Sequence, residues 1–142
     1  MKKFNFLLSL IVGLVLSAGA QVSISTGIQA LPAGAGTSAN FSMNSQQIPA
    51  GDGTLTLYYQ GDFDGVGGNL ENAEVFDENN VFIGASTSVN QCDADLDSVE
   101  FTISRAMLTG WVLDGVIDFT VTPNANVNPG LCADNNWGLK LE

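Results

Sequence analysis

The sequence has no histidine, and it has only 4 Lys and Arg residues against 15 Asp and Glu. Without histidine, catalysis of the Ser-His-Asp or Cys-His type is excluded, as are the common histidine-containing zinc sites. A pI near 4.1 argues against binding to nucleic acid or to an anionic membrane, because like charges repel. The 45% apolar fraction is too high for a disordered acidic tail. The 142 residues therefore suit one folded domain.

The first twenty residues predict a secretory signal peptide. Lys2 and Lys3 form a basic start, residues 4–16 are mostly apolar, and small residues at 17–20 suit cleavage before Gln21. The apolar run is shorter than the roughly 20 residues that a membrane-spanning helix needs. We therefore expect a secreted protein without a transmembrane segment in the mature chain, located outside the cell, at its surface or in the periplasm. An uncleaved anchor is the alternative.

Cleavage at this point would make the protein more acidic. Removing 20 of the 142 residues leaves 122 and takes away two of the four basic residues, so the net charge changes from −11 to −13. Repulsion at this charge destabilises a compact domain unless it is screened. A bound divalent cation would screen it. A solvated acidic surface that keeps the protein soluble is the alternative and needs no ligand.

Cysteine is also rare, with Cys92 and Cys132 as the two copies. An even count in an exported small domain predicts one disulfide bond. The bridge would close a loop of 41 residues, which corresponds to about 4 kcal/mol of stabilisation from chain entropy. A redox or metal-binding pair is disfavoured, because the C-x-x-C spacing is absent.

Most of the mature chain consists of short β-type runs separated by turn residues. Residues 104–115 differ, since a capping serine and spaced apolar positions predict a short helical turn. The pattern predicts one domain over residues 21–142, an antiparallel β-sandwich of the jelly-roll kind, in which residues 21–53 form an N-terminal strand and a long loop. The predicted strands lie at 22–25, 41–43, 54–59, 74–77, 81–84, 99–104, 116–121 and 137–141.

Two acidic segments are candidate calcium sites. Asp62 and Asp64 follow a predicted strand, and glycines between them and Glu71 allow a tight turn that gathers the three carboxylates. The loop is not an EF-hand, because Val66 occupies the third acidic position of that motif.

The second candidate site follows the cysteines. Asp93 and Asp95 come just after Cys92, and Asp134 comes just after Cys132, so a disulfide would bring them together. Crowded carboxylates repel one another unless a cation lies between them. For both segments the alternative is a solvated acidic turn, since Asp, Asn and Gly are common turn formers.

Aromatic residues offer a different candidate site. Tyr58 and Trp111 could stack against a sugar ring, and Tyr58 lies on the strand face opposite to Leu55, Leu57 and Tyr59. Aromatic residues on strands more often belong to the core. Paired carboxylates could also serve a small glycan-active enzyme. We predict no enzyme, because pairs are inevitable among so many acidic residues and 122 residues leave little room for a deep cleft.

An ordered series of motifs extends over residues 54–142: T-L-T-L-Y-Y-Q-G-D-F-D-G, V-F-D-E-N-N-V-F-I-G, Q-C-D, F-T-I-S-R-A-M-L-T-G-W and V-N-P-G-L-C. This series resembles β-sandwich modules that recur in large secreted and surface proteins of bacteria. The resemblance implies a non-catalytic role in adhesion or assembly. The chain departs from it as a free-standing module and at Asn80, where a glycine is expected.

Together these observations predict a secreted, non-enzymatic, calcium-stabilised β-sandwich with an adhesive or structural role. Its partners would be other copies of itself, or a surface protein or glycan. Residues 21–28 look like a free strand that could add to a neighbour's sheet and build a matrix or filament. A carbohydrate-binding module is the alternative function.

Overall fold

A computed structural model describes residues 22–30, 37–45, 47–63, 70–87, 92–93, 95–128, 130–133 and 135–142. The predicted signal peptide lies outside these residues. The described elements are β1 (Ile24–Ala30), β2 (Ala39–Asn44), β3 (Gly53–Gln60), β4 (Ala73–Asp77), β5 (Phe82–Ala85), β6 (Asp97–Ile103), α1 (Arg105–Trp111), β7 (Val116–Pro123) and β8 (Asn136–Leu141). Among these residues, no helix is long and apolar enough to cross a bilayer.

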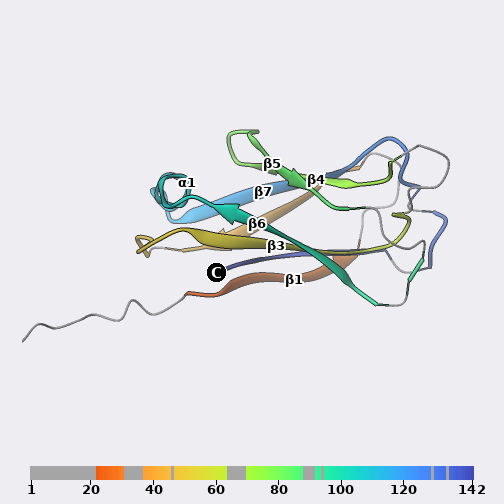
Figure 1. The fold of residues 1–142 in the computed structure, drawn as a ribbon, viewed down its shortest axis with the longest axis horizontal. Coiled ribbons are helices and arrows are strands. Elements are labelled where there is room, and N and C mark those ends of the chain that lie inside the picture. The colour runs from red at the N-terminus through yellow and green to blue at the C-terminus, as the bar shows by residue number, and fades with distance from the viewer. Residues whose placement is uncertain are drawn as a thin grey trace, which may run out of the picture.

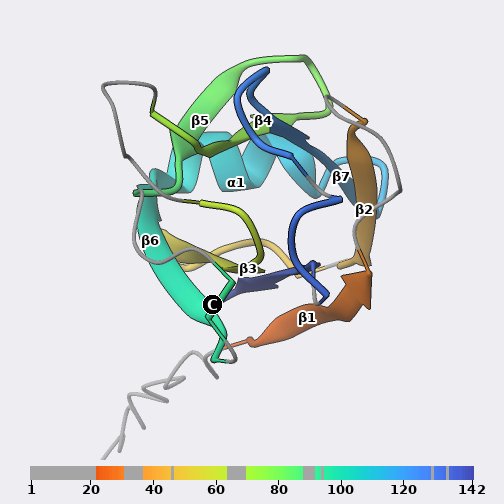
Figure 2. The same ribbon diagram turned by 90° about the vertical axis from the view of Figure 1, so that its right-hand side faces the viewer.

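The described strands form two four-stranded antiparallel sheets that face each other (Figure 1). Sheet A has the order β1-β8-β3-β6, and sheet B has the order β2-β7-β4-β5. Viewed along the strands, the sheets enclose a common interior (Figure 2). The first two strands enter different sheets, and the last two return beside them, which is the jelly-roll connection. The predicted antiparallel sandwich is confirmed.

The core follows from the alternation of apolar and polar residues along the strands. In β3, Leu55, Leu57 and Tyr59 are at most 1% exposed, as their shared face predicted. Phe41 and Met43 of β2 close the interior from sheet B. In β2, β4 and β7 buried and more exposed residues alternate along the strand, because successive side chains point to opposite sides.

The N-terminal part differs from the prediction in two respects. Residues 24–28 are not a free strand, because β1 pairs with β8 over Ile24–Ala30, with one register shift. The strand predicted at 41–43 is present and longer than expected, since β2 pairs with β7 at every position from Ala39 to Asn44. Small and polar residues at its two ends concealed its full length, because only its inward positions are strongly apolar.

The helix α1 covers one end of the sandwich, where Figure 2 shows it behind the strands. Ser104 is its N-cap and accepts a hydrogen bond from the Met107 amide (3.3 Å). Leu108 and Trp111 point inward and are buried. The predicted helical turn is confirmed, and it forms because the cap and two apolar residues on one face favour it.

Candidate functional site

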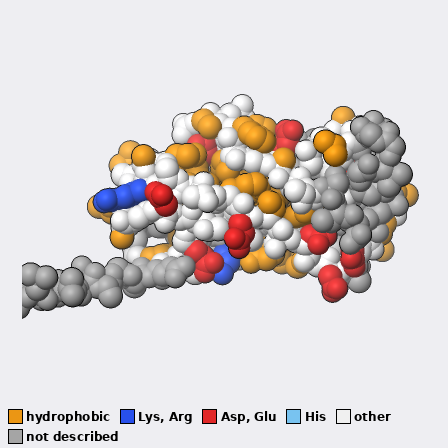
Figure 3. Space-filling view, in the orientation of Figure 1, with side chains coloured by type: hydrophobic (Ala, Val, Ile, Leu, Met, Phe, Trp, Pro, Cys, Tyr) orange, Lys and Arg blue, Asp and Glu red, His pale blue; other side chains and the backbone are white. Residues whose placement is uncertain are grey.

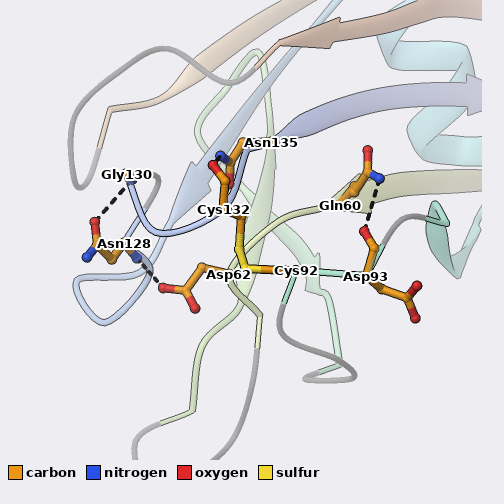
Figure 4. Close-up of a disulfide and its surroundings, with 8 residues drawn as sticks. All are labelled: Gln60, Asp62, Cys92, Asp93, Asn128, Gly130, Cys132 and Asn135. Atoms are coloured by element: carbon orange, nitrogen blue, oxygen red, sulfur yellow. Dashed lines mark hydrogen bonds between the residues drawn. A yellow bond between two sulfur atoms is a disulfide. The ribbon is translucent and has the colours of Figure 1, made fainter.

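The disulfide bond is at the opposite end of the sandwich from α1. The predicted Cys92–Cys132 bridge is present, with an S–S distance of 1.97 Å and the two Cα atoms 5.2 Å apart. Cys92 has a φ of 55°, and its amide donates to the Gly61 carbonyl (2.9 Å). Cys132 is buried. The bridge therefore ties the loop that precedes β6 to the loop that precedes β8, beside the end of β3 (Figure 4).

Gln60 holds these loops against the two central strands of sheet A. Its side chain is 8% exposed, and its amide nitrogen donates to the Asp93 carbonyl (3.0 Å). Its Oε1 accepts from the amide of Asn136 in β8 (2.8 Å). The next residue, Gly61, has a φ of 143°, and a Cβ there would lie 2.4 Å from Asn135 Oδ1. The chain can leave β3 at this point only because residue 61 is glycine.

Asp62, the first predicted calcium ligand, is buried. It is 1% exposed, and its Oδ2 accepts a hydrogen bond from the Asn128 amide (2.8 Å). Asn128 Oδ1 in turn accepts from the Gly130 amide (3.1 Å). An ionised carboxylate at such a depth is costly unless charge or hydrogen bonds compensate it. The position therefore differs from the solvated acidic turn that was the alternative for this residue.

The aromatic cluster next to Asp62 explains why the carboxylate is buried. Phe63 packs edge-on against Tyr59, with ring centroids 5.2 Å apart, and lies 6.3 Å from the ring of Trp137. The Tyr59 hydroxyl donates to the Thr87 carbonyl (2.7 Å). Burial raises the pKa of Tyr59 above its ordinary value. Because the Phe63 side chain packs in the core, the preceding residue, Asp62, is buried as well.

An asparagine-rich loop closes the other side of Asp62. Asn124 and Asn126 both donate side-chain hydrogen bonds to the Leu70 carbonyl. The Asn124 amide donates to the Asn72 carbonyl (2.9 Å). The Oδ1 atom of Asn72 is buried and accepts no hydrogen bond within the part of the chain that the structure describes. The 124–128 loop thus joins the segment around Glu71 to the Asp62 carboxylate.

The other predicted calcium ligands have different outcomes. Asp64 and Asp134 lie outside the described residues. Glu71 is half-buried. Asp93 and Asp95 share one turn, in which the Asp95 amide donates to the Asp93 carboxylate (3.3 Å).

The two predicted sites do not merge into one. Asp62 and Asp93 flank the disulfide, but the Asp62 carboxylate points toward the Asn128 loop and that of Asp93 points away from it (Figure 4). Within the described ranges, no three His, Cys, Asp or Glu side chains are grouped as metal ligands. Calcium takes oxygen ligands from carboxylates, amides and carbonyls, and of the predicted carboxylate ligands Asp62 is the buried one among the described residues.

Sequence reasoning missed the asparagines of this corner. Asn124, Asn126 and Asn128 alternate in the sequence P-N-A-N-V-N, with Val127 buried between the last two. This alternation was the available signal. It places amide side chains at every second position, where they can hydrogen-bond backbone groups of neighbouring loops.

Trp111 is not a sugar-binding platform in this structure. It is 3% exposed, its Nε1 donates to Asp77 Oδ2 (2.9 Å), and its ring packs edge-on against Phe119. The prediction for Trp111 is therefore wrong. As the last residue of α1, it turns into the end of the sandwich, where its ring fills the space between the sheets and its N–H meets a buried carboxylate.

Tyr58 lies where its strand position predicted. It is half-buried on the outer face of sheet A, opposite Gly138 of β8 and Ser98 of β6. Lys140 lies two residues beyond Gly138 in β8, opposite Thr56, and forms an ion pair with Glu142 (2.8 Å). On the far side of Gly138, the Ile28 side chain of β1 fills the space that a Cβ would take.

Comparison with known proteins assigns no relative. No protein family matches the sequence, and no curated protein matches it. The arrangement of the described side chains therefore carries the functional argument.

Proposed function

We propose that this protein is a secreted, non-enzymatic β-sandwich that binds calcium and has an adhesive or structural role. It would assemble with copies of itself into an extracellular matrix or filament, or bind a surface protein or glycan. The observation that carries the proposal is the buried carboxylate of Asp62, held at the disulfide end of the sandwich.

The donor chemistry supports calcium as the ion. In the sequence, Asp62 precedes residues 64–69 and Glu71 follows them, and Asp64 is the first residue of that segment. The buried Asn72 Oδ1 provides a further oxygen next to Glu71. Calcium takes six to eight oxygen ligands from carboxylates, amides and carbonyls. When bound, it would supply positive charge to a mature chain with a net charge of −13.

The lack of histidine and the build of the molecule support a non-catalytic role. General acid–base and nucleophilic catalysis most often use histidine, which this sequence lacks. The disulfide fits an oxidising compartment outside the cytosol. The resemblance to modules of bacterial surface proteins favours adhesion or assembly in the same way.

A thermal melt of the mature protein in calcium and in EDTA tests the metal. Calcium at 100 times its dissociation constant should stabilise the fold by about 2.7 kcal/mol, which corresponds to roughly 10 °C in Tm for a domain of this size. Asp62→Asn should abolish the difference. Glu100→Gln, an exposed acid of β6, should keep it. An unchanged Tm of the wild type in EDTA would remove calcium from the proposal.

Assembly is tested separately. Light scattering and electron microscopy of the wild type, with and without EDTA, should show species larger than a monomer in calcium. A monomer under every condition would contradict the matrix or filament role. It would leave the calcium result standing, because the melt does not depend on association.

Carbohydrate binding is the second candidate function, and the position of Tyr58 favours it. Its ring lies on the outer face of sheet A, and its neighbours across the sheet are Gly138 and Ser98. Aromatic rings beside polar groups are suited to stacking against sugars. Glycan-array binding that Tyr58→Ala abolishes would support this function, and an array without any binding would contradict it.

A further inference from the structure

The outer edges of the two sheets are protected to different degrees. An edge strand exposes backbone N–H and C=O groups that can pair with another chain, and proteins usually protect it by charge or coverage. The β6 edge carries Asp97 and Glu100. The β1 and β2 edges lie against each other along one side of the sandwich (Figure 2). The β5 edge of sheet B carries no charge among its described residues, and β6 contacts it at Gly84, where the Phe101 ring lies.

The pairing of β5 with β4 shows which backbone groups face the open edge. Ser86 N donates to Ala73 O, and Asp77 N donates to Val81 O. These bonds bracket the pairs Glu74–Ala85 and Phe76–Phe82, so both pairs are of the type that exchanges no direct hydrogen bond. The N–H and C=O groups of Phe82 and Ala85 therefore point away from β4.

The side chains along this edge are apolar and uncharged. Residues 79–87 contain no charged side chain. Val81 is 49% exposed and Phe82 is 55% exposed. The Phe82 ring packs against that of Phe76 on the outer face of sheet B, with centroids 5.7 Å apart. Figure 3 shows hydrophobic side chains over the region of β5. The open edge and this apolar patch form one continuous surface.

We propose that β5 pairs antiparallel with β5 of a second copy of this chain, about a two-fold axis. Sheet B of each copy would then continue into one eight-stranded sheet, with the two Phe82 side chains near the axis. A two-fold contact uses the same patch on both copies. This inference rests on the proposed function, because it names the surface through which the protein would self-assemble.

The lack of charge along β5 makes this edge a surface at which two copies can meet with little repulsion. Two mature chains of net charge −13 repel each other over most orientations. The β5 edge lets them approach with uncharged strands between them. The strand has only four residues and one register shift, so the contact is small and the association weak. Salt should strengthen it, because screening reduces the repulsion between the two acidic bodies.

Sedimentation equilibrium of the mature protein measures this association. A concentration series up to about 1 mM, at roughly 0.1 M and 0.5 M NaCl, should show a monomer–dimer equilibrium that is tighter at the higher salt. In an NMR titration over the same series, the amides of Phe82 and Ala85 should shift with protein concentration. Shifts confined to other strands would overturn the proposal.

Two variants act on the edge in different ways. Ala85→Pro removes an outward N–H without removing a bond to β4, and the preceding Gly84 tolerates a following proline. Phe82→Ser removes the exposed ring. Each should weaken dimerisation by about tenfold or more. Leu113→Ser, at an 83% exposed leucine after α1, is the matched control and should change nothing.

The outcomes separate this inference from the proposed function. A dimer whose dissociation constant is the same in both β5 variants overturns the β5 contact and leaves self-assembly intact. A wild type that stays monomeric at every concentration and salt overturns both the β5 contact and self-assembly, and leaves the calcium part of the proposed function to its own test. Circular dichroism confirms that each variant is folded, and Phe82→Ser keeps the test decisive if Ala85→Pro disturbs β5.

Discussion

Each end of the sandwich buries an aspartate, but the groups around the two carboxylates differ. At the α1 end, Asp77 is 6% exposed and accepts three N–H donors: the amides of Asn79 and Val81 and the indole of Trp111. At the disulfide end, Asp62 is 1% exposed, and its carboxylate accepts a hydrogen bond from the Asn128 amide.

The two ends are held together by different means. Asp77 fixes the β4–β5 turn and anchors the last residue of α1, so its environment has a complete structural explanation. The segments around Asp62 are held by the covalent Cys92–Cys132 bridge and by the hydrogen bonds of Gln60 and Asn128. The α1 end is thus held by packing and hydrogen bonds, and the disulfide end by a cross-link and polar contacts.

The largest expected effect comes from breaking the disulfide end. Replacing Cys92 and Cys132 together by serine removes a cross-link with a sequence separation of 40. Urea denaturation should show a loss of about 4 kcal/mol, because the unfolded chain regains the entropy of the open loop. Reduction of the wild type should give a similar loss. A loss below about 1 kcal/mol would mean that the polar contacts of Gln60 and Asn136 hold this end without the bridge.

The next effect breaks the α1 end. Asp77→Ala removes the acceptor for three donors and leaves the Trp111 N–H buried without a partner, so urea denaturation should show a loss of about 3 kcal/mol. The calcium-dependent shift in Tm should stay as in the wild type, because Asp77 lies at the other end. Asp118→Ala removes an exposed carboxylate of β7 and should cost less than about 0.5 kcal/mol. Equal losses in the two variants would contradict the role given to Asp77.

Local patterns in the sequence predicted most of the fold. The alternation of Leu55, Leu57 and Tyr59 specified the buried face of β3, and Ser104 marked the start of α1 at the residue that caps it. Each of these signals arises within one element. Asn80 illustrates the same point, since it takes a φ of 60° in the β4–β5 turn, a conformation that asparagine adopts more readily than most residues.

The candidate site could be predicted only in part, because it depends on contacts between distant segments. The sequence indicated Asp62 as a possible ligand, but its burial follows from Phe63 entering the core beside Trp137. Its partner Asn128 comes from a loop 66 residues further along the chain. Trp111 was misassigned for a similar reason, since its partner Asp77 belongs to β4 and is 34 residues away in the sequence. Periodicity carries no information about such pairs.

A smaller effect should strengthen the α1 end. Gly110 lies in the last turn of α1, and a Cβ added there meets no atom within 4 Å. Gly110→Ala should stabilise the protein by about 0.5–1 kcal/mol, because alanine loses less backbone entropy in a helix. The urea midpoint measures the gain. Gly53→Ala is the contrasting variant and should destabilise, because its Cβ would lie 2.6 Å from the Glu142 carbonyl oxygen and 2.9 Å from Leu108.

The smallest effect concerns the pH dependence of the α1 end. Loss of water around Glu78 and the nearby charge of Asp114 raise the pKa of its carboxyl above its ordinary value. The folded protein therefore holds this proton to a higher pH than the unfolded chain does. Stability then falls as the pH rises from the unfolded pKa through the folded one. Above that window, the repulsion between ionised Glu78 and its acidic neighbours is fully present.

Glu78→Gln removes this repulsion. Its Tm should equal that of the wild type at a pH below the unfolded pKa of Glu78 and should exceed it by a small amount near neutral pH, because the amide carries no charge at either pH. Melts at several pH values between these limits measure the difference. Glu100→Gln removes the same charge from β6 of sheet A. The acids that act on Glu78, Asp77 and Asp114, lie outside that strand. An equal gain in the two variants would mean that net charge, and not the surroundings of Glu78, determines the effect.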